Sequence, residues 1–294
     1  MTWVFYSLLA AMLWAIVNVT DKYTMDKLVT NPMIPVLILG LVQLITAVSI
    51  YCFYGYAFVT SIDLTLAFLA GLFYVATMFF YYQAIKKDEI SKLIPLYYLA
   101  PVFILLIAQF MMNENLFHNQ YWGIGFLVSG AILISLPTPF KLRFNEGAGY
   151  MLLAAFFYAL NQVLTKYLLK ENDFWSVFAY VRIGIFLSLL PLFYWVLIYK
   201  TDSYRNVSYQ AYGIMVSNQL LNIAGVFAIT VALTQGYVTL VNALASVQPF
   251  FVLILTTALG IMLPNIIKES MSSSALIKKF LAIALIFIGM LAVR

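Results

Sequence analysis

Apolar stretches long enough to cross a lipid bilayer recur from one end of this sequence to the other. They fall at residues 3–22, 33–56, 64–85, 92–112, 119–136, 148–168, 174–199, 210–233, 239–262 and 276–293. A helix needs about 20 apolar residues to cross the hydrocarbon core. Backbone polar groups in lipid must be satisfied within their own segment, so continuous apolar runs predict helices rather than barrel strands. The sequence therefore predicts an all-α integral membrane protein with ten transmembrane helices.

The shortage of charge supports the same fold class. Of 294 residues, 64% are hydrophobic and only 9% are charged, whereas a soluble domain carries about 25% charged residues. So few charges cannot cover a water-exposed surface of this size, and ten spans with short connections leave no room for a soluble domain. No basic residue precedes the first apolar stretch, so we expect a retained first span rather than a signal peptide.

Residue counts exclude several chemistries. Cys52 and His118 are single residues of their types, so a disulfide framework or a cysteine or histidine metal site within one chain is not expected. The sequence contains no G-x-x-x-x-G-K-[ST] motif, which excludes ATP as a directly bound energy source of that kind. The net charge of +5 reflects topology rather than nucleic-acid binding. We expect no metal and no cofactor, a small-molecule substrate and the lipid bilayer as partners, and a monomer or homodimer.

The sequence also contains an internal repeat. The segment LLAAMLWAIVNVTDKY at 8–23 aligns without gaps with LLAAFFYALNQVLTKY at 152–167, and eight of the sixteen positions are identical. Pro101 then aligns with Pro249, and Gly130 with Gly289 in the last span of each half. The copies begin at spans one and six, so each contains five spans. An odd number of crossings inverts the second copy, which is a common plan for secondary transporters.

The repeat divides the chain into two units of five helices. We place the first at 1–136, a linker at 137–147 and the second at 148–294. Connections after odd-numbered spans hold twelve of the sixteen Lys and Arg residues, against three on the opposite side. Because basic residues are enriched in cytoplasmic loops, we expect both termini to lie on the outer, non-cytoplasmic side of the cell membrane.

These features resemble the EamA-like, ten-span branch of the drug/metabolite transporter superfamily. The resemblance rests on the duplicated five-span unit, the first-span sequence, Pro101 followed by Glu114, and the fifth-span sequence GIGFLVSGAILI. It implies a secondary transporter, exporter or facilitator of a metabolite, amino acid or drug-like solute. Transport would proceed by alternating access through a central cavity. Two features depart from the pattern, since Met262 replaces the counterpart of Glu114 and Arg182 has no counterpart in the first half.

Charged residues in or near the spans are the first site candidates. Arg182 lies within the predicted seventh span, where a charge costs about 2.5–3.5 kcal/mol on insertion scales. It either binds an anionic group of the solute, or reaches the interface or fixes helix packing. No carboxylate is expected within a span, because Asp21, Asp63, Glu89 and Glu114 fall at predicted helix ends. Glu114 is the candidate for ion coupling, and the alternative is that it caps a loop.

Aromatic and amide residues at helical spacing are the other candidates for a cavity wall. Trp14 and Asn18 share one face of the first span, and Tyr158 and Gln162 repeat the pattern in the sixth. Further candidates from three other spans are Tyr81, Tyr82, Gln219, Asn222, Asn242 and Ser246. The alternative is that such side chains hold helices together or form the interfacial belt. Pro101 and Pro249 are either gating hinges or static kinks.

Two other functions remain open at this stage. A flippase for a lipid or lipid-linked sugar is possible among relatives, and Arg182 would then bind a phosphate. A membrane-embedded transferase would need a cluster of acids, histidines or metal ligands at one interface, and the sequence offers one histidine and scattered carboxylates. A channel is disfavoured, because no ring of charges or filter loop is visible.

Overall fold

The protein is a bundle of α-helices. The computed structural model describes residues 2–29, 33–57, 59–87, 90–136, 146–199, 207–262 and 273–293, and these contain no strand. The helices are α1 (Thr2–Lys27), α2 (Met33–Tyr54), α3 (Ser61–Lys87), α4 (Ile90–Tyr97), α5 (Ala100–Met112), α6 (His118–Ser135), α7 (Glu146–Glu171), α8 (Phe174–Tyr199), α9 (Tyr209–Gln235), α10 (Val238–Ala245), α11 (Gln248–Met262) and α12 (Ser273–Ala292). Each predicted apolar stretch corresponds to one of these helices or to a pair of them.

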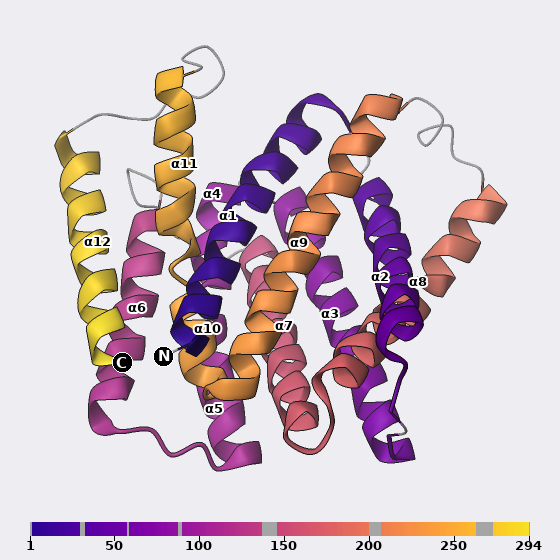
Figure 1. Cartoon of the computed structure of the whole chain (residues 1–294). Helices are drawn as coiled ribbons and strands as arrows, with labels where there is room; N and C mark the ends of the chain where they lie inside the picture. Colours follow the sequence, from indigo (N-terminus) through magenta and orange to yellow (C-terminus); the bar gives the residue numbers. More distant parts are fainter. Residues whose placement is uncertain are drawn as a thin grey trace.

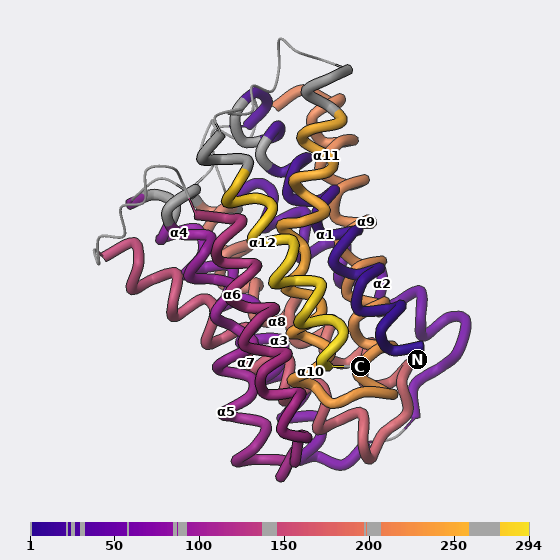
Figure 2. The backbone as a smooth tube through the Cα atoms, turned by 90° about the vertical axis from the view of Figure 1, so that its left-hand side faces the viewer, coloured from indigo at the N-terminus to yellow at the C-terminus, as the bar shows by residue number. Residues whose placement is uncertain are grey.

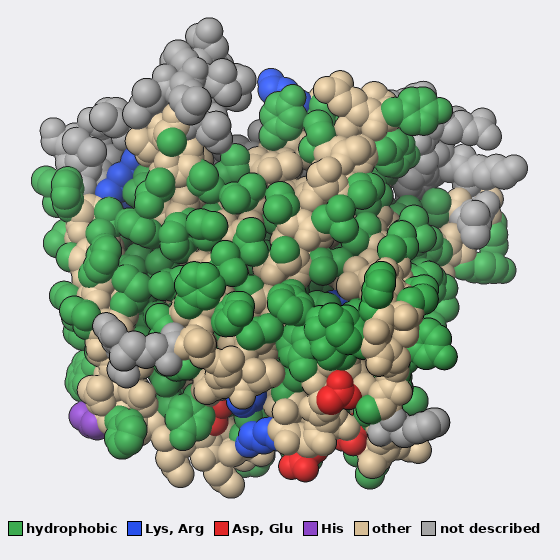
Figure 3. All heavy atoms as spheres, in the orientation of Figure 1, with side chains coloured by type: hydrophobic (Ala, Val, Ile, Leu, Met, Phe, Trp, Pro, Cys, Tyr) green, Lys and Arg blue, Asp and Glu red, His purple; other side chains and the backbone are tan. Residues whose placement is uncertain are grey.

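The predicted all-α membrane fold is confirmed, and the count of ten spans stays a prediction. Eight helical stretches within the described ranges are long and apolar enough to cross a bilayer, with α4–α5 and α10–α11 each contributing one stretch. Helices α6 and α12 occupy the predicted fifth and tenth places but are not among the eight. The surface agrees with a lipid environment, because large apolar side chains such as Phe53 (82% exposed) and Phe110 (89% exposed) face outward. Figure 3 shows this apolar cover across the middle of the molecule.

The fourth and ninth predicted spans are broken rather than continuous. Helix α4 ends at Tyr97 and α5 begins at Ala100, while α10 ends at Ala245 and α11 begins at Gln248. Pro101 and Pro249 are the second residues of the following helices. Proline has no N–H to donate and is best accommodated in the first turn of a helix. Each proline therefore begins a new helix and is not a kink inside one.

Apart from the pairs α4–α5 and α10–α11, each of which continues in one direction, successive helices run in alternating directions. Figure 1 shows α1 rising from the lower half of the molecule, where both termini lie, and α7 descending toward its lower end. The first helices of the two halves are therefore antiparallel. Most of the predicted linker, 137–147, lies outside the described residues, and an ion pair of 2.7 Å between Lys87 and Glu146 joins the ends of α3 and α7 beside it.

The contacts between helices occur in pairs that are equivalent under exchange of the two halves of the chain. Helix α1 packs against α9, α10 and α11, and α7 packs against α3, α4 and α5, which hold the same places in the first half. Helices α2 and α8 pack against each other, as do α6 and α12, which lie side by side in Figure 2. Exchanging the two halves thus leaves the main pattern of neighbours unchanged. The most extensive contacts join one half to the other, so the halves interdigitate.

Glycines allow two helix contacts, between α3 and α8 and between α6 and α12, to become very close. A Cβ atom on Gly71 of α3 would lie 2.5 Å from backbone atoms of α8, at Gly184 and Ile185. In the α6–α12 pair, a Cβ on Gly130 would lie 2.7 Å from Ile286, and one on Gly289 would lie 2.7 Å from Leu127. Small residues let helix backbones approach where lipid provides no hydrophobic driving force between helices. The glycines aligned by the repeat therefore pack in one shared interface.

Candidate functional site

A cavity of about 170 Å³ lies between the two halves of the bundle. Helices α1, α2, α3, α4, α5, α7, α9, α10 and α11 contribute to its wall. Nine of the eleven residues predicted for a solute site line it: Trp14, Asn18, Tyr81, Tyr82, Tyr158, Gln219, Asn222, Asn242 and Ser246. Sequence reasoning did not include the apolar wall from α2, formed by Pro35, Val36 and Leu39. The structure brings the predicted residues together, and their contact with a solute stays a prediction.

Tyrosine rings form much of the cavity wall. The ring centroid of Tyr97 lies 5.8 Å from that of Tyr158 and 6.2 Å from that of Tyr81. Tyr98 lies in the break between α4 and α5, and Tyr74 of α3 completes the wall. The Tyr97–Tyr81 pair is edge-to-face and the Tyr97–Tyr158 pair is tilted, and rings at these separations attract each other. The wall offers ring faces for a flat solute or for a cation.

Amide side chains fix the aromatic residues from both halves. Trp14 Nε1 donates to Asn222 Oδ1 at 3.1 Å, and Asn222 Nδ2 donates to Tyr74 Oη at 3.3 Å. A Cβ on Gly225 would lie 2.8 Å from the Trp14 indole, so the ring rests on the backbone of α9. These contacts hold the indole at the edge of the cavity.

The equivalent aromatic position in the second half is held in a similar way. Tyr158 donates from its hydroxyl to Asn242 Oδ1 at 3.1 Å, and Gln162 Nε2 donates to the same oxygen at 2.8 Å. Asn242 Nδ2 donates to the carbonyl oxygen of Val238 at 2.9 Å. The paired positions Trp14 and Tyr158 therefore each receive an amide partner from the half of the chain that follows α8.

Asp21 corrects one expectation from the sequence. It was placed at a helix end, but α1 continues to Lys27, so Asp21 lies within the helix and lines the cavity. Asn218 Nδ2 of α9 donates to Asp21 Oδ1 at 2.6 Å. Among the described residues that line the cavity, Asp21 is the one charged side chain. Asp21 lies on the same helix face as Trp14 and Asn18, and this spacing could have predicted that it lines the cavity. The sequence predicted a helix end at this point because the apolar stretch ends there.

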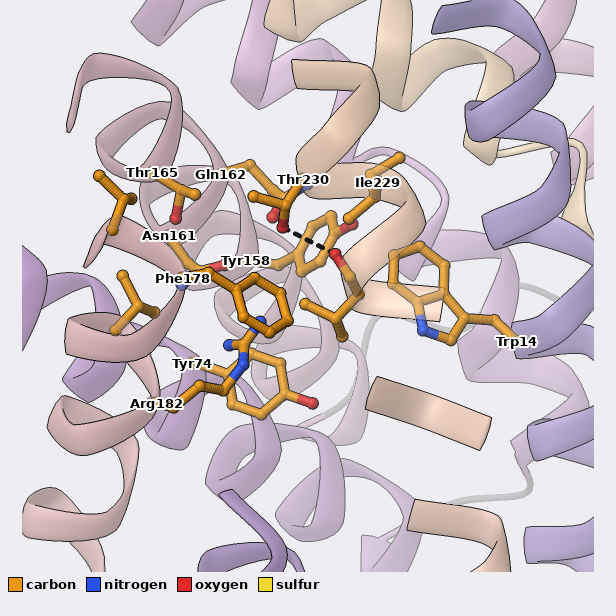
Figure 4. Close-up of a pocket in the computed structure, with 13 residues that line it drawn as sticks. Trp14, Tyr74, Tyr158, Asn161, Gln162, Thr165, Phe178, Arg182, Ile229 and Thr230 are labelled. Carbon is orange, nitrogen blue, oxygen red and sulfur yellow. Dashed lines mark hydrogen bonds between the residues drawn. The ribbon is translucent and has the colours of Figure 1, made fainter. Parts of the chain in front are cut away.

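Arg182 lies outside the central cavity. It lines a neighbouring cavity of about 20 Å³ and is 3% exposed. Its guanidinium carbon lies 4.1 Å from the centroid of the Phe178 ring. Figure 4 shows the guanidinium group beside the rings of Phe178 and Tyr74, with Trp14 at the far side of the pocket. Gln162 also lines this smaller cavity rather than the central one.

Glu114 lies at the start of α10, and it is not among the described residues that line either cavity. Its Oε1 accepts from the backbone N–H of Val238 at 2.8 Å, and its Oε2 accepts from the Thr239 hydroxyl at 2.9 Å and the Thr239 N–H at 3.4 Å. A helix N-terminus leaves N–H groups without partners and attracts negative charge. These hydrogen bonds favour the capping interpretation, because the Glu114 carboxylate, in the first half, caps the N-terminus of α10 in the second half.

Replacing Glu114 with glutamine should destabilise the protein by about 2–4 kcal/mol. Only one atom of the new amide can accept, so at least one donor at the start of α10 loses its partner, and the charge at the helix N-terminus is lost. Thermal unfolding of the purified protein measures the effect. Glu171→Gln is the matched control, because Glu171 is exposed at the end of α7, and an equal loss in both variants would contradict the capping role.

The two prolines differ in their relation to the cavity. Pro101 lines the central cavity, whereas Pro249 is not among its described lining residues. A hinge role for either proline stays a prediction. Within the described ranges, no three His, Cys, Asp or Glu side chains come together as metal ligands.

Comparisons with known proteins agree with this architecture. Residues 1–136 match the EamA-like transporter family. Over 132 residues the chain is 26% identical to "Uncharacterized transporter YxxF" of Bacillus subtilis (strain 168), and the match covers 44% of this chain and 42% of that protein. Less than half of the relative's length is therefore matched.

A solved protein crystal structure has the same fold. It superposes with a TM-score of 0.76 at 15% sequence identity, and the match covers 99% of each chain. This structural match shows the fold alone, whereas the two sequence matches are to proteins described as transporters. The resemblance inferred from the sequence is confirmed by the match of residues 1–136 to the EamA-like transporter family.

Proposed function

We propose that this protein is a secondary transporter or facilitator of a small organic solute in the cell membrane. The observation that supports this most directly is the central cavity of about 170 Å³ between the two halves of the bundle. Its wall combines aromatic rings with amide groups and one carboxylate. Binding sites for small molecules are concave and mostly apolar, with a few polar groups that fix orientation.

The charge of the cavity favours a solute with an amino group and an aromatic or apolar body. Asp21 is the one charged side chain among the described lining residues. A carboxylate in a site of low dielectric attracts a cation strongly, and tyrosine faces attract cations through their quadrupoles. Arg182, which would favour an anionic solute, faces the smaller cavity.

The equivalent pairs of helix contacts support an organisation into two inverted units, 1–136 and 148–294. Because α1 packs most extensively on α9, and α3 on α7, each such pair contains one helix from each unit. We expect these mixed pairs to move as bodies during alternating access, rather than the two sequence halves. The cavity lies between them, lined by both α1 and α9 on one side and by α3 and α7 on the other.

The positions of the lining residues support access from the end with the Lys-rich connections. Asp21 lies in the last turns of α1 and Pro35 in the first turn of α2, and both helix ends are at the upper end in Figure 1. At the lower end, Glu114 closes α5 onto α10, and Lys166 Nζ donates to the carbonyl of Leu233 at 2.6 Å. With the positive-inside rule, the upper end is cytoplasmic and the cavity faces the cytoplasm.

Ligand binding and transport test the proposal in two steps. Purified protein is first screened by thermal unfolding against small aromatic amines, their carboxylate analogues and uncharged analogues. A ligand at a concentration 100 times its Kd stabilises by about 2.7 kcal/mol, which raises the Tm by about 5 °C or more. The amines should give the larger shifts, and hits are then tested for uptake into proteoliposomes.

The outcome of the transport assay distinguishes a transporter from a flippase and from a transferase. Uptake that saturates and accelerates with unlabelled solute on the opposite side would support a transporter. Scrambling of a labelled lipid without uptake of any solute would contradict the proposal and favour a flippase. Turnover of a lipid-linked substrate by the purified protein would contradict it in favour of a transferase.

A further inference from the structure

Arg182 is a buried cation that forms no ion pair with any residue that the structure describes. The residue is 3% exposed, and the one ion pair among the described residues joins Lys87 and Glu146 at the end of the bundle. Arg182 Nε has no hydrogen-bond partner in the part of the chain that the structure describes. An uncompensated buried charge costs several kcal/mol, and the contact with the Phe178 ring offsets only part of this cost.

A second donor without a partner faces the same small cavity. Thr165 of α7 is 7% exposed, and its hydroxyl makes no hydrogen bond with any described residue. Thr230 also lines the cavity, but its hydroxyl already donates to the carbonyl of Val226 at 2.7 Å. Asn161 likewise donates its amide to the carbonyl of Ala70 at 2.8 Å. Arg182 Nε and the Thr165 hydroxyl are therefore two donors of this cavity that can bind an anion, and the Tyr74 hydroxyl, which accepts from Asn222, is a third.

The size of the cavity restricts its occupant. Its volume of about 20 Å³ exceeds the roughly 10–15 Å³ that one water molecule requires. One particle of water size or slightly larger fits, whereas a carboxylate or phosphate attached to a solute needs more room. We propose that this cavity is a binding site for a single halide ion, chloride, held by the Arg182 guanidinium and the Thr165 hydroxyl.

The halide site is separate from the solute site. The two cavities share Trp14, Tyr74 and Tyr158, but Asp21 belongs to the central cavity and Arg182 to the smaller one. A bound chloride neutralises Arg182 and leaves Asp21 as the net charge facing the solute. The site needs no assumption about the transported solute, so it can be tested without a transport assay.

Halide-dependent stability of the full chain tests the site. The purified protein is unfolded by heat in sodium gluconate, and chloride or bromide then replaces gluconate at constant ionic strength. A halide that binds only the folded state stabilises it by RT ln(1 + [L]/Kd). We expect a saturable rise in Tm with chloride and with bromide, and no such rise in Arg182→Gln.

Two threonines provide a matched pair of variants. Thr165→Val removes a hydroxyl that donates to the halide and should raise its apparent Kd roughly tenfold. Thr230→Val removes a hydroxyl from the same cavity that is already bonded to the backbone, and should leave the halide response unchanged. This comparison decides the question even if Arg182→Gln does not fold.

Several results would overturn the proposal. Equal Tm values of the wild-type protein in chloride and gluconate would mean that the cavity holds water only. An undiminished chloride response in Arg182→Gln, or equal responses in the two threonine variants, would place the halide elsewhere. Crystals grown with bromide should show an anomalous peak between Arg182 and Thr165, and no peak there would contradict the site.

Discussion

Replacing Gly71 with alanine should prevent stable folding of this protein or lower its stability by about 3 kcal/mol. The new Cβ atom would lie 2.5 Å from the carbonyl carbon of Gly184 and 2.5 Å from the amide nitrogen of Ile185. These are backbone atoms of α8, so no side-chain rotation relieves the clash, and the two helices must separate. Thermal unfolding and size-exclusion chromatography in detergent measure the loss.

A matched glycine separates this clash from the general effect of the substitution. Gly149 lies in α7, and a Cβ added there meets no atom within 4 Å. Alanine in an exposed helix position is normally favoured over glycine by about 0.5–1 kcal/mol, so Gly149→Ala should be neutral or slightly stabilising. If Gly71→Ala unfolds at the wild-type temperature, helices α3 and α8 do not cross as closely as described.

The second large effect is expected at Asp21. Changing it to asparagine should weaken the binding of a cationic solute about a hundredfold, which is near 3 kcal/mol. Asparagine retains an oxygen that can accept from Asn218, the residue that donates to Asp21 at 2.6 Å. Folding should therefore be largely preserved while the attraction for a cation is lost. Isothermal titration with an amine found in the ligand screen measures the change.

Controls make this test specific for charge at one position. Glu171→Gln removes a carboxylate that is exposed at the end of α7, and it should leave binding unchanged. An uncharged analogue of the amine should bind the wild-type protein and Asp21→Asn about equally. Undiminished amine binding by Asp21→Asn would exclude Asp21 as the cation-binding group and leave the ring faces as the remaining candidate.

The halide and solute proposals also predict independent behaviour. Asp21→Asn should leave the chloride response intact, because Asp21 does not line the small cavity around Arg182. Loss of the halide response would not by itself affect the case for the solute site. The two charges therefore have separate roles, although both cavities border Tyr74.

Much of the site could be predicted from the sequence because membrane helices are strongly constrained. Apolar length fixes where helices lie, and helical spacing fixes which residues share a face. Trp14 and Asn18 on α1 could therefore be assigned to one wall, and nine of the eleven predicted site residues line the central cavity. The repeat also predicted that Trp14 and Tyr158 hold equivalent positions, although it did not specify their amide partners.

Other features depend on contacts that a sequence does not specify. Arg182 and Glu114 are both unusual in an apolar chain, yet neither lines the central cavity, because one faces a small pocket beside Phe178 and the other caps α10. Asp21 was assigned to a helix end because hydropathy measures the length of a span and not the length of its helix. Its role depends on Asn218, which is distant in sequence and adjacent in space.

By itself, the sequence determined the membrane environment, the helical class and the residues that share each helix face, because lipid demands apolar, internally bonded segments. Only the tertiary structure decided which faces meet. Helices of the two halves pack on each other more extensively than on their own neighbours in sequence, and this pairing depends on glycine contacts and polar bonds between distant segments. For that reason the tertiary structure alone could separate the carboxylate of the central cavity from the arginine beside it.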